Sequence, residues 1–188
     1  MEIRYLDGIK EVLYDKKWAG SAGNPELYYM HRGIKEKKGL RYDITIIPPQ
    51  MLGKEFTKTL GHEHSDNFGE IYTVLSGKAV YLIQKVKKNK VEDVYIVKAK
   101  KGESAIIPSG YGHITINASE KILKESNWLA KNCKNIYDVF LKNHGACYYY
   151  TDKGWIKNKN YKSVPKLRFK KPLKSIPKNL DFLYGKNN

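Results

Sequence analysis

Two histidines two positions apart, followed closely by a glutamate, are the residues in this chain best suited to chemistry. His62 and His64 stand in the sequence Gly-His-Glu-His, and Glu70 follows after five further residues. On a β-strand, residues two apart project from the same face, so both imidazoles can point at one place while Glu63 points away. A third histidine, His113, comes after a Pro-Ser-Gly-Tyr-Gly segment that is typical of a turn.

Three imidazoles and one carboxylate form a good ligand set for Fe, Mn, Ni, Co or Zn. Four protein ligands on a six-coordinate ion leave two positions open for neighbouring oxygens of a substrate. An isolated His-x-His pair is more often a pair of surface histidines, so the prediction depends on the residues around it. The proposed metal ligands are His62, His64, Glu70 and His113.

Glycines recur at fixed distances from these histidines. Six residues separate Glu70 from Gly77, and Gly102 and Gly110 precede His113 in the second segment. Each of these glycines falls in an expected turn, where the backbone adopts φ values that a Cβ penalises. The two segments resemble the paired motifs of the cupin superfamily, a small double-stranded β-helical barrel that holds a metal on three histidines and one glutamate.

Within that superfamily, one stretch is similar to the archaeal cupin-type glucose-6-phosphate isomerases. It comprises residues 53–64, GKEFTKTLGHEH, and residues 70–72, EIY. A fainter similarity extends over residues 4–150. The resemblance implies a metal-dependent aldose–ketose isomerase that interconverts glucose 6-phosphate and fructose 6-phosphate in glycolysis and gluconeogenesis.

The resemblance also implies roles for individual residues. His62, His64, Glu70 and His113 correspond to the metal ligands, and Glu70 is the expected catalytic proton carrier. One divalent ion per subunit is implied, with Fe expected ahead of Mn, Ni or Zn, and so is a homodimer. The residues expected to bind the sugar phosphate are Thr45, Thr59, Gly61, Tyr72, Tyr28 and Tyr137.

The chain departs from the family pattern beyond the last expected barrel strand. The family has a tyrosine and a histidine there; Tyr137 corresponds to the tyrosine, but residues 132–136 contain no histidine. The exact sugar is therefore left open. Lys134 or the basic C-terminal arm is the replacement that we consider for phosphate recognition.

Short strands separated by turns must position these side chains. Their regular spacing predicts an all-β sandwich or barrel, and the resemblance narrows this to the cupin jelly-roll barrel with extra N-terminal strands or a helix. Residues 5–14 fit either an amphipathic helix or a strand pair, and residues 135–143 fit a short helix. Strands are predicted at residues 41–47, 70–75, 79–87, 92–98, 104–107, 113–117, 121–128 and 148–150.

The length of 188 residues predicts one domain, here residues 1–156 with a barrel core at about 41–128. Residues 157–188 form a basic arm that three prolines interrupt, and ten Lys or Arg against one Asp give it +9 of the formal net charge of +16. Such a charge fits either nucleic acid or a small phosphorylated ligand. Because it is concentrated in the arm, without the aromatic-basic alternation of a recognition module, nucleic acid is the weaker alternative.

Other features limit where and how the protein acts. No apolar run approaches the roughly 20 residues that a membrane helix needs, and the N-terminus lacks the order of a signal peptide, so we expect a cytoplasmic protein. Cys133 and Cys147 are expected to be reduced and buried. The alternatives to an isomerase are another metal-dependent cupin enzyme such as a dioxygenase, or a non-catalytic cupin that binds a sugar phosphate or nucleic acid.

Overall fold

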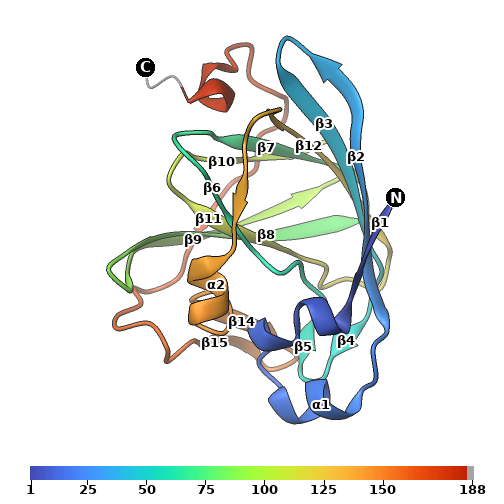
Figure 1. The fold of residues 1–188 in the computed structure, drawn as a ribbon, viewed down its shortest axis with the longest axis vertical. Helices are drawn as coiled ribbons and strands as arrows, with labels where there is room; N and C mark the ends of the chain where they lie inside the picture. Colours follow the sequence, from blue (N-terminus) through green and yellow to red (C-terminus); the bar gives the residue numbers. More distant parts are fainter. Residues whose placement is uncertain (186–188) are drawn as a thin grey trace.

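The computed structural model describes residues 1–185, and most of them form facing β-sheets around one main hydrophobic core (Figure 1). Within this range, the larger sheet has six strands in the spatial order β1 (Glu2–Tyr5), β2 (Glu26–Lys37), β3 (Leu40–Ile47), β12 (Leu123–Ala130), β7 (Glu70–Ser76) and β10 (Ser104–Ile107). The opposing sheet has four strands in the order β11 (Gly112–Ile116), β8 (Lys78–Lys87), β9 (Lys90–Lys100) and β16 (Arg168–Lys170).

Two smaller sheets and several short helices complete the described part of the chain. One sheet pairs β13 (Asn135–Ile136) with β6 (Glu63–His64), and the other has the order β15 (Gly154–Lys157), β14 (Tyr148–Thr151), β5 (Glu55–Phe56) and β4 (Met51–Leu52). The helices are α1 (Lys16–Ser21), α2 (Asp138–Lys142) and the 3-10 helices η1 (Leu6–Gly8), η2 (Lys10–Val12) and η3 (Asp181–Tyr184). Among these, none is both long and apolar enough to cross a membrane.

Strand order confirms the predicted all-β jelly-roll barrel. In the larger sheet β12 lies between β3 and β7, and in the opposing sheet β11 lies beside β8, so strands distant in sequence pair with one another. Such crossing connections are typical of jelly rolls. The predicted strands between Leu40 and Ala130 are all present, with ends that differ by at most a few residues.

Glycine positions confirm the expected turns. Gly77, Gly102 and Gly110 have φ values of +80°, +83° and +74°. At Gly77 a Cβ would also lie 2.6 Å from the carbonyl oxygen of Ile122. Only glycine fits both the backbone conformation of the turn between β7 and β8 and the space left by the backbone of Ile122.

The prediction for residues 5–14 was wrong, since they form neither an amphipathic α-helix nor a strand pair. After Tyr5 at the end of β1, the chain makes the two 3-10 helices η1 and η2. Leu6, Ile9 and Val12 are at most 1% exposed. Because side chains three apart eclipse one another in a 3-10 helix, this spacing directs all three into the core.

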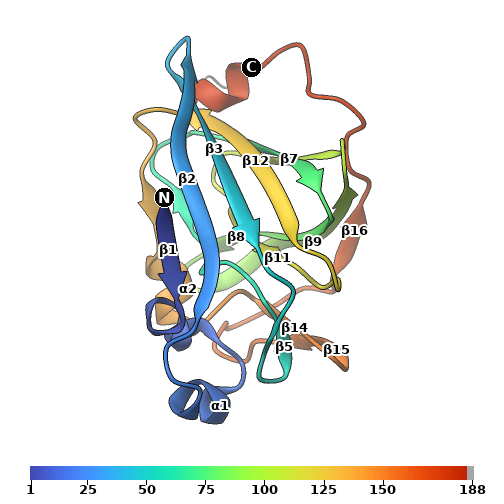
Figure 2. The same ribbon diagram turned by 90° about the vertical axis from the view of Figure 1, so that its right-hand side faces the viewer.

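The basic C-terminal arm lies along the barrel. Its strand β16 pairs in parallel with β9, as Figure 2 shows, and Leu173 exchanges two backbone hydrogen bonds with Ser104 at 2.9 and 2.8 Å. Farther along the arm lies η3, where the carbonyl oxygen of Phe182 accepts a 2.9 Å hydrogen bond from the amide of Gly69. Leu183 is fully buried in a second apolar cluster with Leu40 and Ile71. The arm therefore supports the loop that precedes β7.

We predict that Leu183→Ala lowers the free energy of unfolding by about 2 to 4 kcal/mol, because it removes a fully buried side chain and leaves a cavity. Urea denaturation followed by circular dichroism measures this change. Leu173→Ala, at a position that is 36% exposed, is the control and should cost less than about 1 kcal/mol. Equal losses in the two variants would contradict the supporting role of η3.

Candidate metal centre and its pocket

His62 and His113 are brought together by their own backbones. The amide of His62 donates to the carbonyl of His113 at 3.2 Å, and the amide of His113 donates to the carbonyl of His62 at 3.0 Å. Gly61 makes this close approach possible: its φ is +90°, and a Cβ there would lie 2.5 Å from Ile114 and 2.6 Å from Phe140. The chain before His62 can therefore press against β11 only with glycine at this position.

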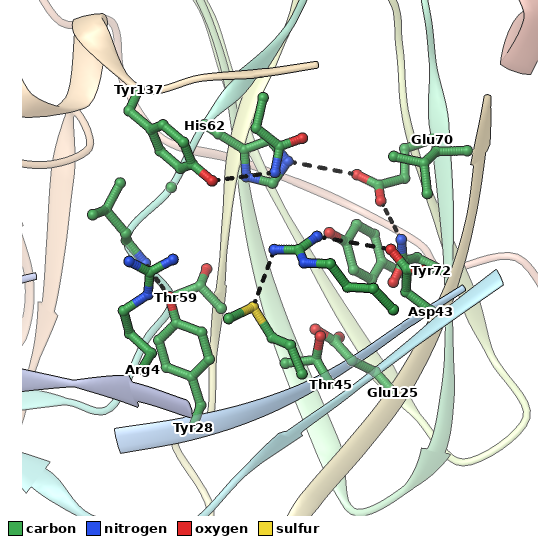
Figure 3. A pocket seen from close by; sticks show the side chains of 17 residues that line it. Arg4, Tyr28, Asp43, Thr45, Thr59, His62, Glu70, Tyr72, Glu125 and Tyr137 are labelled. Carbon is green, nitrogen blue, oxygen red and sulfur yellow. Dashed lines mark hydrogen bonds and ion pairs between the residues drawn. The ribbon is translucent and has the colours of Figure 1, made fainter. Parts of the chain in front are cut away.

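His64 and Glu70 reach the same place from the two ends of one loop. His64 lies on β6 and pairs with Asn135 of β13, and Glu70 is the first residue of β7. The predicted projection of His62 and His64 to one side is confirmed, since their ring centres are 5.1 Å apart. Figure 3 shows His62 and Glu70 on one wall of a pocket.

The four predicted ligands form one cluster. One oxygen of Glu70, Oε2, lies 3.2 Å from Nε2 of His64, 3.3 Å from Nε2 of His113 and 4.0 Å from Nε2 of His62. One candidate ligand atom from each of the four side chains lies within 4.8 Å of the others. His64, Glu70 and His113 are buried, and His62 is partly buried.

The polar atoms of this cluster fit a divalent metal ion. Oε2 of Glu70, both ring nitrogens of His64 and Nδ1 of His113 are buried without a well-aligned hydrogen-bond partner. Buried polar atoms are normally satisfied, so an arrangement with several unsatisfied ones indicates a site built for a bound group. Imidazole nitrogens and a carboxylate oxygen are suitable ligands for several transition metals.

Protonation in the cluster follows from burial and from the neighbouring charges. Burial, with the nearby His113, holds the pKa of His62 well below its usual value, which favours the neutral form that can bind a metal. Burial would raise the pKa of Glu70, but the close approach of His113 and His64 outweighs it and holds that pKa well below its usual value. Glu70 is therefore anionic, the state in which a carboxylate can bind a metal.

Asn127 orients the glutamate. Its Nδ2 donates a 2.6 Å hydrogen bond to Oε1 of Glu70, so that Oε2 is the oxygen left facing the histidines. Tyr72, which pairs with Asn127 across β7 and β12, places its hydroxyl 3.1 Å from Nε2 of His113. We did not predict Asn127. Its signal was a run of polar residues at positions 124–127, within the strand predicted at residues 121–128.

The pocket beside the cluster is lined by every residue predicted to bind substrate. Tyr28 comes from β2 and its hydroxyl accepts a 3.3 Å hydrogen bond from the amide of Leu60; Oγ1 of Thr59 accepts a 3.0 Å bond from the amide of Thr115. Figure 3 shows Tyr137 near His62, with Tyr28, Thr59 and Thr45 farther from Glu70. The predicted residues found in this lining are Thr45, Thr59, Gly61, Tyr72, Tyr28 and Tyr137.

Two arginines that we did not predict also line the pocket. Arg32 lies 3.1 Å from a carboxylate oxygen of Glu2 and 3.8 Å from one of Asp43, and the Nε of Arg4 is buried without a hydrogen-bond partner. Neither Lys134 nor any residue of the arm is part of the lining within residues 1–185. Positive charge at the pocket therefore comes from the N-terminal strands rather than from the arm considered for that purpose.

Comparison with known proteins assigns the family. The family model described as glucose-6-phosphate isomerase matches residues 30–166, which include all four candidate ligands. The chain belongs to this family. Curated members named glucose-6-phosphate isomerase from Thermococcus litoralis and Pyrococcus abyssi are each 28% identical over 125 residues, or 63% of this chain. The match spans 64% of each of these glucose-6-phosphate isomerases, which is less than two thirds of their length.

Solved structures are more distant. An oxalate oxidase in complex with the substrate analogue glycolate is 16% identical, with a TM-score of 0.49 over 63% of this chain and 58% of that one. The Cnp3 cupin domain of Schizosaccharomyces pombe is 13% identical, with a TM-score of 0.40 over 54% of this chain and 62% of that one. At these values the likeness carries no inference about activity.

We predict that His113→Ala removes most of the bound metal, because it deletes one of four ligands in a buried cluster. Elemental analysis of the protein purified after metal loading measures the occupancy. His144→Ala replaces an exposed histidine outside the cluster and serves as the control. Metal occupancy in His113→Ala equal to that of the unmodified protein would contradict this assignment of the ligands.

A weaker effect is expected at the residue that orients Glu70. Asn127→Ala removes the hydrogen bond to Oε1, and loss of such an orienting contact typically costs about 10- to 100-fold in metal affinity or activity. Competition with a chromophoric chelator measures the affinity. Ser126→Ala, on the same strand, should leave it within about twofold. The orienting role fails if the two variants bind metal equally well.

Proposed function

We propose that the chain is a metal-dependent aldose–ketose isomerase that interconverts glucose 6-phosphate and fructose 6-phosphate. The observation that carries this proposal is the cluster of three histidines and Glu70 on the wall of a pocket, in a chain of the glucose-6-phosphate isomerase family. The presence of all six expected substrate residues around the same pocket supports it.

The ion that we propose is a single divalent metal held by His62, His64, Glu70 and His113. These ligands suit Fe, Mn, Ni and Zn. Fe is the first candidate because the family resemblance implies it ahead of the others. When bound, such an ion supplies electrostatic stabilisation to negative charge that develops on the oxygens of C1 and C2.

Glu70 is the residue that we propose to move the proton. Isomerisation transfers a hydrogen between C1 and C2, and a carboxylate within reach of both carbons can take the proton from one and return it to the other. Asn127 holds Oε1 of Glu70, which leaves Oε2 as the oxygen directed toward the cluster. A direct hydride shift between the carbons is the competing route.

The other pocket residues would bind and orient the sugar phosphate. We assign the phosphate to Thr45, Thr59 and the amide of Gly61, where small side chains permit close approach. Tyr28, Tyr72 and Tyr137 would contact sugar hydroxyls. Arg4 and Arg32 line the same pocket; Arg32 is paired with Glu2 and Asp43, whereas the unpartnered Nε of Arg4 is a suitable group to meet an anionic ligand.

A coupled assay tests the proposed reaction. Protein reconstituted separately with Fe, Mn, Ni and Zn is given fructose 6-phosphate, and the formation of glucose 6-phosphate is followed by its enzymatic oxidation. We expect turnover with at least one metal and none after chelation. Absence of turnover with all four metals would exclude this function.

We predict that Glu70→Gln retains part of the bound metal and loses turnover, since the amide keeps an oxygen ligand but cannot accept the proton. Elemental analysis and the coupled assay measure the two quantities on one preparation. Glu63→Gln is the matched control, because Glu63 is the neighbouring carboxylate of β6 and lies outside the cluster. Turnover in Glu70→Gln comparable to that of Glu63→Gln would remove Glu70 as the proton carrier.

A homodimer and a cytoplasmic location complete the proposal. Both come from the sequence and from the family resemblance, and both stay predictions.

A further inference from the structure

A second carboxyl group lines the pocket, apart from the four-residue cluster. Glu125, on β12, is 1% exposed. Its Oε2 accepts a 2.7 Å hydrogen bond from the hydroxyl of Tyr81, whereas its Oε1 is buried without a well-aligned partner. A buried polar atom that lacks a partner at the wall of a pocket is available to a ligand.

Glu125 is adjacent to a residue that we assign to phosphate binding. It pairs directly with Thr45 across β12 and β3, so both side chains project from the same face of the sheet. Figure 3 shows the two side chains together at one side of the pocket. A substrate held by Thr45 would therefore bring its anionic end close to Glu125.

The charge of Glu125 decides whether it helps or opposes such a ligand. An ionised carboxylate repels a phosphate, whereas a protonated carboxyl group donates a hydrogen bond to it. Burial raises the pKa of Glu125 to about 8, although the hydrogen bond from Tyr81 lowers it in part. At pH 7 the group is therefore mostly neutral, and it becomes anionic as the pH rises through about 8.

We propose that Glu125 binds the sugar phosphate as a neutral acid, donating a hydrogen bond from Oε1 to a substrate oxygen next to Thr45, and that its ionisation sets the upper pH limit of substrate binding. This proposal rests on the proposed function, because it takes a sugar phosphate as the ligand. It makes Glu125 a binding residue, separate from the proton transfer assigned to Glu70.

The pKa shifts of the groups around Glu125 point to Glu125 as the side chain whose change of charge alters substrate binding between pH 7 and 9.5. Burial raises the pKa values of Tyr72 and Tyr81 well above 10. The pKa values of Glu70 and His113 lie below their ordinary values. Asp43 on β3 and Glu70 and Tyr72 on β7 line the same pocket as Glu125, and Tyr81 on β8 is its hydrogen-bond partner.

The arginines of the pocket and the phosphate of the substrate keep nearly the same charge between about pH 7 and 9.5. Arg4 and Arg32 line the pocket and attract an anion in both protonation states of Glu125. A phosphate monoester has a second pKa of about 6, so the substrate carries nearly the same charge from about pH 7 to 9.5. A loss of binding in this range therefore reports on the protein.

The decisive experiment is the pH dependence of KM for fructose 6-phosphate with metal-loaded protein. If only neutral Glu125 binds substrate, KM rises by about 30-fold between about pH 7 and 9.5 in the unmodified protein, as expected for a group with a pKa of about 8. In Glu125→Gln, whose side chain is uncharged at every pH, KM should be independent of pH over this range. The same rise in Glu125→Gln would overturn the proposal.

A second variant changes the pKa while keeping the carboxyl group. Tyr81→Phe removes the hydrogen bond that stabilises the carboxylate, so the pKa of Glu125 rises and the loss of binding moves to higher pH. This test remains decisive if Glu125→Gln does not fold. An unchanged pH limit in Tyr81→Phe would contradict the role of Glu125.

Calorimetric binding of sorbitol 6-phosphate, which cannot isomerise, separates this proposal from the proposed function. We expect the unmodified protein to bind it about 30-fold more weakly at about pH 9.5 than at pH 7. If the purified protein binds this analogue with the expected pH dependence but shows no turnover with any metal, the proposed isomerase function is refuted and the binding role of Glu125 is supported. Turnover together with binding that does not depend on pH would do the reverse.

Discussion

The burial of one carboxylate among three imidazoles is the constraint on which the rest of the structure depends. An isolated buried charge costs several kcal/mol, so Glu70 is tolerable only where other groups compensate it. Asn127 satisfies one oxygen, and the three histidines surround the other. The compensating groups come from three segments, at residues 62–64, 113 and 127, and the barrel must bring those segments together with little freedom.

Backbone pairing supplies this precision. The reciprocal hydrogen bonds of His62 and His113 fix two ligands relative to each other without any contribution from side chains. The loop from His64 to Glu70 is short, and η3 supports it from outside through the amide of Gly69. Residues 181–184 lie outside the segment that the family model matches, so this support is an addition to the part of the chain that defines the family.

Much of the fold and of the metal cluster could be predicted because both leave local signals. Strands around the cluster alternate or run apolar, glycines mark their turns, and the His-x-His spacing places two ligands on one face. Asn127, Glu125, Arg4 and Arg32 were missed because a polar residue in a strand usually faces solvent, and only the packed barrel shows that these face a pocket. The 3-10 turns after Tyr5 and the course of the arm depend on contacts with distant segments, which periodicity does not show.

Parallel pairing of β16 with β9 has a consequence for self-association. Without the arm, the eleven-residue strand β9 would be the edge of its sheet, with a row of free amide and carbonyl groups and several buried apolar residues. Exposed edges of this kind are templates for strand addition by another molecule, and proteins commonly block them with short, charged strands. The strand β16 has three residues, Arg168, Phe169 and Lys170. The arm thus covers part of this sheet edge with a short strand that carries two positive charges, a feature that disfavours strand addition by another molecule whatever ligand the pocket holds.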